Sequence, residues 1–259
     1  MLEMFRAAKI KEVASLIELS AKGAMPPPYD GPRPSLVAGL KAAGPLPVIA
    51  EYKRASPSRG DINLAATPES IARAYANAGA GAISVLTEET YFKGSLGFLA
   101  RMTAPGLPLL RKDFILHPLQ VIQTATTPAS ALLVIVRMIN DAALDTLLRE
   151  AKRQGLEVVA EVFSETDLER AQRASASITQ VNNRDLDSLK TDLTVSRSLV
   201  DRKQAHEFWI TASGIESHER LASLLDLGFD AALVGTSLMR GDNPGRELAE
   251  LLHGGRFHA

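Results

Sequence analysis

The sequence predicts an α/β fold, a (β/α)8 TIM barrel with an extra N-terminal helical segment. Eight short apolar runs recur along the chain, segments long enough for a helix separate them, and no linker or change of composition divides them. The chain has 259 residues, close to the length of one such barrel. We therefore expect a single domain over residues 1–259, in which residues 1–46 form a helical extension that caps the barrel.

The apolar runs are rich in Val, Ile or Leu and end at Gly, Pro or a charged residue, as buried strands do. The predicted strands are residues 47–53, 81–87, 108–112, 131–136, 157–161, 177–182, 207–211 and 230–234. Their centres lie roughly 20–35 residues apart, which leaves room for one helix and two loops. An open doubly wound sheet is the alternative, but the Gly-rich turn that it needs after the first strand is absent, and Glu51-Tyr-Lys-Arg-Ala-Ser56 stands there instead.

Helix boundaries are indicated by capping residues and by glycine after the last turn. The predicted N-caps are Thr67, Asp141 and Ser217. In the N-terminal segment, residues 8–19 predict an amphipathic helix with Ile10, Val13 and Ile17 on its apolar face, and a Pro-rich stretch follows it. We expect this segment to act as a plug or flap that closes one end of the barrel.

Composition excludes several kinds of chemistry. The chain has no cysteine, which excludes disulfides, thiolate metal sites and a cysteine nucleophile. Its five histidines are scattered, without the spacing of metal ligands, so we expect no metal and no other cofactor. The net charge is −1, and the longest apolar run, residues 131–136, is too short to span a bilayer. We expect a cytoplasmic protein with neither nucleic acid nor membrane as a partner.

Polar side chains accumulate where the predicted strands end, and that is the reactive face of a parallel barrel. They are Glu51, Lys53, Lys112, Glu161, Asn182, Arg184 and Ser213. Because side chains alternate along a strand, Glu51 and Lys53 point to the same side. An ion pair that only seals the barrel could explain one pair of charges, but charges from several strands at one rim favour a catalytic site.

Two glycine-bearing turns predict a phosphate site. Ser213-Gly214-Ile215 follows the seventh strand and Gly235-Thr236-Ser237 the eighth, where barrels of this kind bind phosphate through backbone N–H groups. Ser56 could add a hydroxyl. Apolar residues near the strand ends are Phe92, Phe114, Leu133 and Leu186. A flat apolar slot beside a phosphate site predicts an aromatic phosphoester as the small-molecule substrate.

Seven blocks of sequence support a more specific interpretation. They are residues 48–58, 86–95, 110–115, 159–162, 181–186, 213–215 and 233–239. The most specific are RKDF at 111–114 and NNRDL at 182–186. In order and spacing these blocks resemble the indole-3-glycerol-phosphate synthase family, and the resemblance covers roughly residues 47–240. The N-terminal helix also resembles the extra helix of that family.

The resemblance implies a lyase of tryptophan biosynthesis, and so of aromatic amino-acid biosynthesis. It would close 1-(2-carboxyphenylamino)-1-deoxyribulose 5-phosphate to indole-3-glycerol phosphate, with loss of carbon dioxide and water and without a cofactor. Lys112 would protonate the ribulose carbonyl oxygen, and Glu161 would stabilise the cationic intermediate and take part in proton removal. Lys53 and Glu51 would serve the dehydration and position Lys112. A desolvated site near other cations would lower the pKa of Lys112, an effect that Glu51 would oppose.

The resemblance also implies binding roles. Asn182 and Arg184 would orient the polar groups of the substrate. Phosphate would be held by Ser56, Ser213, Gly214, Gly235 and Thr236, and the anthranilate ring would pack on Phe92, Phe114, Leu133 and Leu186. Contact with other enzymes of the tryptophan pathway is a further possibility that the family suggests.

The chain departs from the family at two places. Ala212 stands where the family usually has a glutamate, and residues 119–130 lack the usual charged helix, which we expect to be altered or short. The departure at 212 keeps a catalytically silent phosphoester-binding barrel as one alternative. A Schiff-base aldolase that uses Lys112 or Lys53 is another. Phosphoribosylanthranilate isomerase, a neighbouring barrel, would be expected to use a cysteine base, which this chain lacks.

Overall fold

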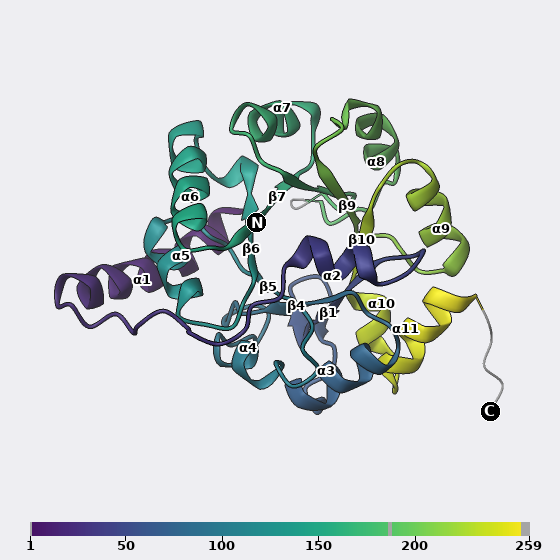
Figure 1. Cartoon of the computed structure of the whole chain (residues 1–259), viewed down its shortest axis with the longest axis horizontal. Coiled ribbons are helices and arrows are strands. Elements are labelled where there is room, and N and C mark those ends of the chain that lie inside the picture. Colours follow the sequence, from purple (N-terminus) through teal and green to yellow (C-terminus); the bar gives the residue numbers. More distant parts are fainter. Residues whose placement is uncertain (1, 186–187, 255–259) are drawn as a thin grey trace.

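The computed structural model describes residues 2–185 and 188–254, and eight parallel strands form a closed barrel ringed by helices (Figure 1). The strands are β1 (Val48–Tyr52), β4 (Ala82–Leu86), β5 (Leu109–Lys112), β6 (Ala131–Ile135), β7 (Glu157–Val162), β8 (Ile178–Asn182), β9 (Phe208–Ala212) and β10 (Ala231–Val234). Strand β1 pairs with β4 on one side and with β10 on the other, which closes the barrel. The predicted (β/α)8 TIM barrel with an extra N-terminal helix is confirmed.

Every predicted barrel strand is present, and each of its ends agrees with the prediction to within one residue. The agreement has a physical reason. Strands of a parallel barrel are covered on both faces, so they appear in the sequence as unbroken apolar runs with sharp ends.

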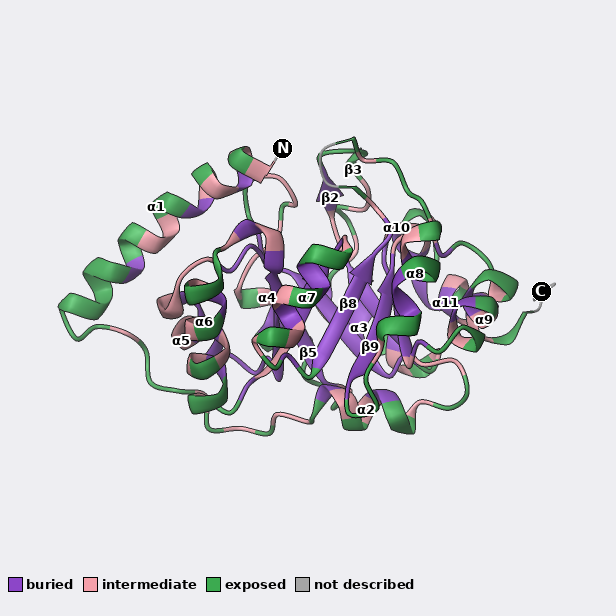
Figure 2. Ribbon diagram, turned by 90° about the horizontal axis from the view of Figure 1, so that it is seen from above, coloured by how far each residue is buried: buried purple, intermediate pink, exposed green. Residues whose placement is uncertain are grey.

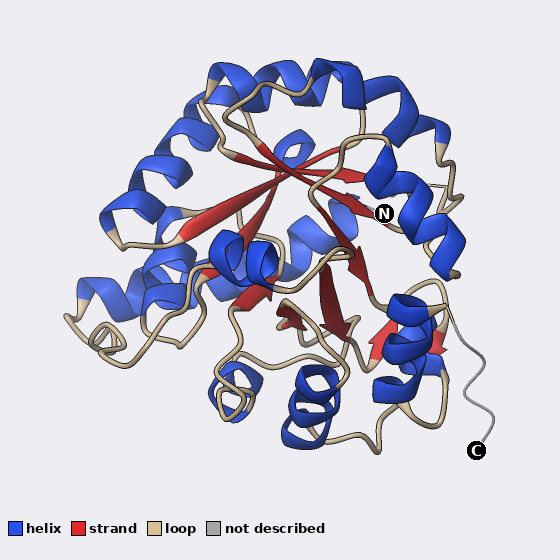
Figure 3. Ribbon diagram, turned by 45° about the vertical axis from the view of Figure 1, so that its right-hand side comes forward, coloured by secondary structure: helices blue, strands red, loops and turns tan. Residues whose placement is uncertain are grey.

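Helices cover the outside of the barrel (Figure 3). They are α3 (Pro68–Asn77), α4 (Gly97–Arg101), α5 (Pro118–Ala125), α6 (Asp141–Arg153), α7 (Glu165–Arg173), α8 (Thr194–Leu199), α9 (His218–Asp226), α10 (Thr236–Arg240) and α11 (Pro244–His253), with 3-10 turns at Val136–Met138 and Val200–Arg202. Thr67 and Ser217 are N-caps as predicted, whereas α6 is capped by Asn140, and Asp141 is its first residue. Helix α5 is short, as expected from the unusual sequence there.

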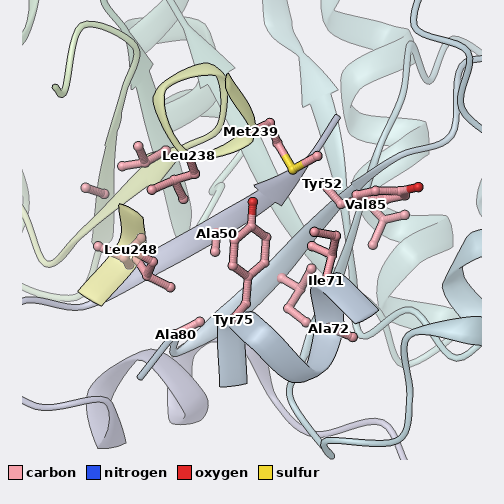
Figure 4. Packing of buried hydrophobic residues seen from close by; sticks show 14 of the residues in the cluster. Ala50, Tyr52, Ile71, Ala72, Tyr75, Ala80, Val85, Leu238, Met239 and Leu248 are labelled. Carbon is pink, nitrogen blue, oxygen red and sulfur yellow. The ribbon is translucent and has the colours of Figure 1, made fainter. Parts of the chain in front are cut away.

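The outer face of the barrel packs against these helices. In Figure 4, Tyr75 of α3 lies against Ala50 of β1, with Leu248 of α11 nearby. The Tyr75 hydroxyl is buried and donates a hydrogen bond of 3.1 Å to the backbone carbonyl of Glu51. This contact anchors the backbone of β1 at the residue whose side chain enters the barrel mouth.

The N-terminal extension contains α1 (Leu2–Ala21) and α2 (Leu36–Ala42). Figure 2 shows α2 at one end of the barrel, with the start of α1 and the small hairpin of β2 (Ala55–Ser56) and β3 (Gly60–Asp61) at the other. The Leu36 and Leu40 side chains of α2 are fully buried, and the backbone N–H of Leu36 donates to the Glu157 carboxylate at the start of β7. Helix α2 therefore closes the amino ends of the strands, while α1 approaches their carboxyl ends.

The buried face of α1 differs from the predicted one. Ile10 is 62% exposed and Ile17 is 49% exposed, whereas Phe5, Lys9 and Leu16 are buried. The predicted apolar stripe was therefore wrong as a packing face. Within the residues that the structure describes, no helix is long and apolar enough to cross a membrane.

Candidate active site

A pocket opens at the carboxyl ends of the barrel strands. Its lining includes the predicted residues Glu51, Lys53, Ser56, Phe92, Lys112, Phe114, Leu133, Glu161, Asn182, Arg184, Ser213, Gly214, Gly235 and Thr236. Leu186, the remaining predicted site residue, lies outside the described residues. The closed barrel thus brings side chains that are more than 180 residues apart in sequence to one pocket.

Glu51 holds two lysines at the pocket floor. Its Oε1 lies 2.6 Å from Nζ of Lys53, and its Oε2 lies 3.1 Å from Nζ of Lys112. Glu51 is almost fully buried, and burial alone would raise its pKa, but the two ammonium groups outweigh burial and lower the pKa to about 2. We call Glu51, Lys53, Lys112 and Glu161 the mouth cluster.

The two lysines have opposite pKa shifts. Burial lowers the pKa of Lys53, and the nearby Lys112 ammonium adds to that effect, so that Glu51 only partly opposes it. Burial also acts on Lys112, but Glu51 and Glu161 together raise its pKa above the ordinary value. The lowering expected for Lys112 is therefore found at Lys53, because Lys112 has two carboxylates beside it.

Glu161 is the other buried carboxyl group of the pocket. Burial raises its pKa, while Lys112 and hydrogen bonds from the Gln180 and Asn182 side chains act in the opposite direction. The Nε2 group of Gln180 donates to Oε2 of Glu161. A carboxyl group with a raised pKa can gain or lose a proton closer to neutral pH than an ordinary glutamate can.

Glycine at position 235 leaves room for this arrangement. A Cβ atom on Gly235 would collide with Oε1 and the other carboxylate atoms of Glu51. The turn after β10 therefore needs glycine because the Glu51 side chain passes close to its backbone. Gly214, in the turn after β9, has a φ of +79°, in the left-handed region that favours glycine.

The polar side of the pocket carries positive charge and hydroxyl groups. Arg184 is half-buried, and burial together with the nearby cations Arg59 and Arg240 lowers its pKa. Asn182 accepts hydrogen bonds from the Ser213 hydroxyl at 2.8 Å and from the backbone N–H of Arg184 at 3.0 Å. Arginines gathered beside the partly buried turns after β9 and β10 form a site suited to an anion.

Aromatic rings form the apolar side of the pocket. Phe5 of α1 stacks on Phe114 with ring centroids 4.2 Å apart and an interplanar angle of 14°. Phe92 lies 5.9 Å from Phe5 and 6.1 Å from Phe114, and Leu133 of β6 also lines the pocket. These side chains provide the flat apolar slot predicted beside the charged groups.

Several lining residues were not predicted from the sequence. They are Phe5, Leu86, Ile135, Leu189, Glu216 and Arg240, among others. Ile135 follows the inward alternation of Leu133, and Arg240 lies one helical turn beyond Thr236, so both carried a usable signal. The sequence gives no sign that Phe5 lines the pocket, because its position depends on how α1 packs against the barrel.

The RKDF block sends its side chains to two sides of the barrel wall. Lys112 points into the mouth, whereas the Arg111 and Asp113 side chains meet charged groups of α1. There Lys9 lies 2.5 Å from both Asp113 and Glu12, and Arg111 lies 3.0 Å from Asp113. Arg111 also lies 3.3 Å from Glu12. We call Lys9, Glu12, Arg111 and Asp113 the docking cluster.

The described residues contain no cluster of side chains suited to bind a metal ion. Over residues 2–185 and 188–254, no group of three or more His, Cys, Asp or Glu side chains is arranged to hold a metal ion.

The fold and the site together place this chain among the (β/α)8 barrels that carry ionisable side chains in a pocket at the carboxyl ends of their strands. The family model for indole-3-glycerol phosphate synthase matches residues 7–251. The indole-3-glycerol phosphate synthase of Aquifex aeolicus is 43% identical over 79% of this chain and 80% of its own length. That of Opitutus terrae is 39% identical over 94% of this chain and 95% of its own. The chain belongs to the indole-3-glycerol phosphate synthase family.

Solved structures agree on the fold. The 3-hexulose-6-phosphate synthase of Salmonella typhimurium superposes with a TM-score of 0.62 and covers 80% of this chain and 98% of its own. Its sequence identity is 14%, so this likeness concerns the barrel and carries no information about the reaction.

Proposed function

We propose that this enzyme closes 1-(2-carboxyphenylamino)-1-deoxyribulose 5-phosphate to indole-3-glycerol phosphate. A bond forms between the ring carbon that bears the carboxylate and the ribulose carbonyl carbon. The carboxylate leaves as carbon dioxide, which restores the aromatic ring, and the former carbonyl oxygen leaves as water. The carbonyl oxygen takes up a proton as the ring closes and a second as it leaves, and the carbon between the nitrogen and the former carbonyl carbon loses one. The mouth cluster supplies acid and base groups for these transfers.

Lys112 is the acid that starts the reaction. Its pKa is raised by Glu51 and Glu161, so it is fully protonated at neutral pH and offers N–H donors to the carbonyl oxygen. Protonation of that oxygen makes the carbonyl carbon electrophilic toward the ring. Glu51 positions the Lys112 ammonium through the contact of 3.1 Å.

Glu161 and Lys53 serve the later steps. The Glu161 carboxylate faces the cation that forms when the ring attacks, stabilises it and takes part in proton removal. Lys53 has a lowered pKa, which makes it a stronger acid than Lys112 and suits it to protonate the departing hydroxyl. Glu51 remains ionised throughout, because its pKa is about 2.

The remaining pocket residues bind the substrate. The anthranilate ring packs on Phe92, Phe114 and Leu133, and Leu186 belongs to the same proposal on the resemblance alone. The phosphate binds among Ser56, Ser213, Gly214, Gly235 and Thr236, where the field of Arg184 attracts it. Asn182 and Arg184 orient the polar groups between these two ends.

One observation carries the proposal: Glu51 pairs with both Lys53 and Lys112 at the floor of a pocket that has an aromatic wall and an anion site. The test is to incubate the purified protein with the substrate and follow the fluorescence of the indole product. Borohydride is added in a parallel reaction. Indole-3-glycerol phosphate without a trapped lysine adduct is expected, whereas a reduced substrate–lysine adduct would point to an aldolase.

The proposal extends to the setting of the reaction. A small-molecule phosphoester is the partner, and we place the reaction in the cytoplasm as part of tryptophan biosynthesis. Contact with other enzymes of that pathway is part of the same proposal, and co-purification of the chain with those enzymes tests it.

A further inference from the structure

Gln180 is a buried polar residue of the barrel interior to which no role has yet been given. It lies on β8 and is fully buried. In strand register it stands beside Glu161 of β7 on one side and beside Ile210 of β9 on the other. Its side-chain amide donates to Oε2 of Glu161, and its own Oε1 has no hydrogen-bond partner among the described residues.

The end of strand β9 supplies no further polar side chain to Glu161. Ala212 ends β9, is buried and pairs in register with Asn182 of β8. Its methyl side chain offers no polar group to Asn182 or to Glu161 from this end of β9. The side-chain hydrogen bonds to Glu161 come from Gln180, its register partner on β8, and from Asn182, two residues further along that strand.

We propose that Gln180 is a positioning residue that aims the Glu161 carboxylate at the substrate through the hydrogen bond from Nε2 to Oε2. The proposal rests on the proposed function, in which Glu161 takes part in proton removal. Without the Gln180 amide, Oε2 of Glu161 would face Ile210 and the apolar interior, and the carboxylate could turn toward Lys112 instead.

An amide suits this position in both protonation states of Glu161. The NH2 group donates to the carboxylate, and after rotation of the amide the carbonyl oxygen can accept from the carboxylic acid. The charged groups that act on Glu161 are Lys112 of β5 and Glu51 of β1. Since neither group changes when Gln180 is replaced, an effect of the replacement on the pH profile can be assigned to the amide.

The test replaces Gln180 by leucine, which keeps much of the volume and removes the hydrogen bond. For Gln180→Leu we expect kcat to fall about 10- to 100-fold, the range for loss of a group that orients an active one, while KM changes little. We also expect the acidic limb of the pH profile to move to higher pH. The donor favours the carboxylate form, so its loss raises the pKa of Glu161.

Thr179→Val is the matched control. Thr179 is the preceding residue of β8, is fully buried, points to the opposite face of the strand, and its hydroxyl has no partner among the described residues. We expect this variant to keep the wild-type kcat, KM and pH profile. Thermal unfolding of every variant shows whether the barrel is intact.

The outcomes separate the two proposals. If wild-type protein makes no indole-3-glycerol phosphate, the proposed function fails and the role of Gln180 fails with it. If wild-type protein is active and folded Gln180→Leu has the kcat and pH profile of Thr179→Val, the positioning role alone is overturned. Should Gln180→Leu not fold, Gln180→Met is measured in its place, and failure of both to fold would make Gln180 a packing residue and overturn the proposal.

Discussion

The mouth cluster and the docking cluster are both largely buried groups of two cations and two anions, and each contains one cation of β5, Lys112 in the first and Arg111 in the second. In the docking cluster every shift favours charge. Burial would lower the pKa of Lys9, but the carboxylates of Asp113 and Glu12 outweigh burial and raise it. Arg111 and Lys9 in turn lower the pKa of the buried Asp113 to about 2. Lys9 and Asp113 therefore join α1 to the barrel as an ion pair that stays charged near neutral pH.

The mouth cluster behaves differently. Glu51 and Lys112 are held in their charged forms, but burial moves the pKa of Lys53 down and that of Glu161 up, toward the neutral forms. Two groups that are held charged therefore stand beside two that can change their protonation state. The difference supports the proposal that the mouth cluster, rather than the docking cluster, performs the chemistry.

The largest expected effect is on turnover. Lys112→Ala and Glu161→Gln should each lower kcat by about 10²- to 10⁴-fold, the usual contribution of a general acid or base, and both variants should keep the circular dichroism spectrum of the folded barrel. Lys152→Ala, on the exposed face of α6, serves as the control. A wild-type kcat for Lys112→Ala or Glu161→Gln would contradict the proposal that the mouth cluster performs the chemistry.

Breaking the docking cluster should change stability. Lys9→Ala removes one partner of a buried ion pair and should lower the free energy of unfolding by about 3 kcal/mol in urea titrations. Its kcat should change far less than that of Lys112→Ala. Lys11→Ala, an exposed lysine on the same helix, should change stability by less than about 0.5 kcal/mol. Equal stability of the two variants would show that the cluster does not hold α1.

The docking cluster also predicts a dependence of stability on pH. The pKa of Asp113 is about 2 in the folded protein, below that of an unfolded aspartate, so its contribution is present above about pH 4 and is lost as the pH falls through 2. Wild-type protein should exceed Asp113→Asn in stability by about 2 kcal/mol more at pH 6 than at pH 2. A difference that does not change with pH would contradict the ionised state of Asp113.

Phe5 lies between the docking cluster and the pocket, and its replacement should change the kinetic constants least among these variants. It is carried by the helix that the docking cluster holds, and it stacks on Phe114 in the pocket. Phe5→Ala should raise KM severalfold, equivalent to about 1 kcal/mol, and leave kcat within a small factor. Ile10→Ala changes an exposed residue of the same helix and should leave both constants unaltered.

The barrel could be predicted from the sequence because its strands are short, apolar and bounded by turn residues. The alternation within β1 also placed Glu51 and Lys53 on one face. What joins Lys112 to Glu51 is the strand order and register, in which β4 lies between β1 and β5. That relation depends on the strand order and register and is not a local property of the sequence.

The N-terminal helix shows where sequence periodicity fails. Ile10 and Ile17 predicted a buried face, yet Lys9 is buried because Asp113 lies opposite it. Within NNRDL, Asn182 lines the pocket, whereas the buried Asn183 donates to Thr211 and the carbonyl of Ala212 and so joins β8 to β9. Two adjacent asparagines cannot be assigned to chemistry and to structure without knowledge of the strand to which each one bonds.

A single-turnover measurement tests the role of the mouth cluster most directly. Enzyme in excess over 1-(2-carboxyphenylamino)-1-deoxyribulose 5-phosphate is mixed at neutral pH, and carbon dioxide and indole fluorescence are followed together. Wild-type protein should release one carbon dioxide for each indole-3-glycerol phosphate, and Lys112→Ala should release neither at a comparable rate. Folded wild-type protein that consumes no substrate, or Lys112→Ala that matches it, would contradict the assignment.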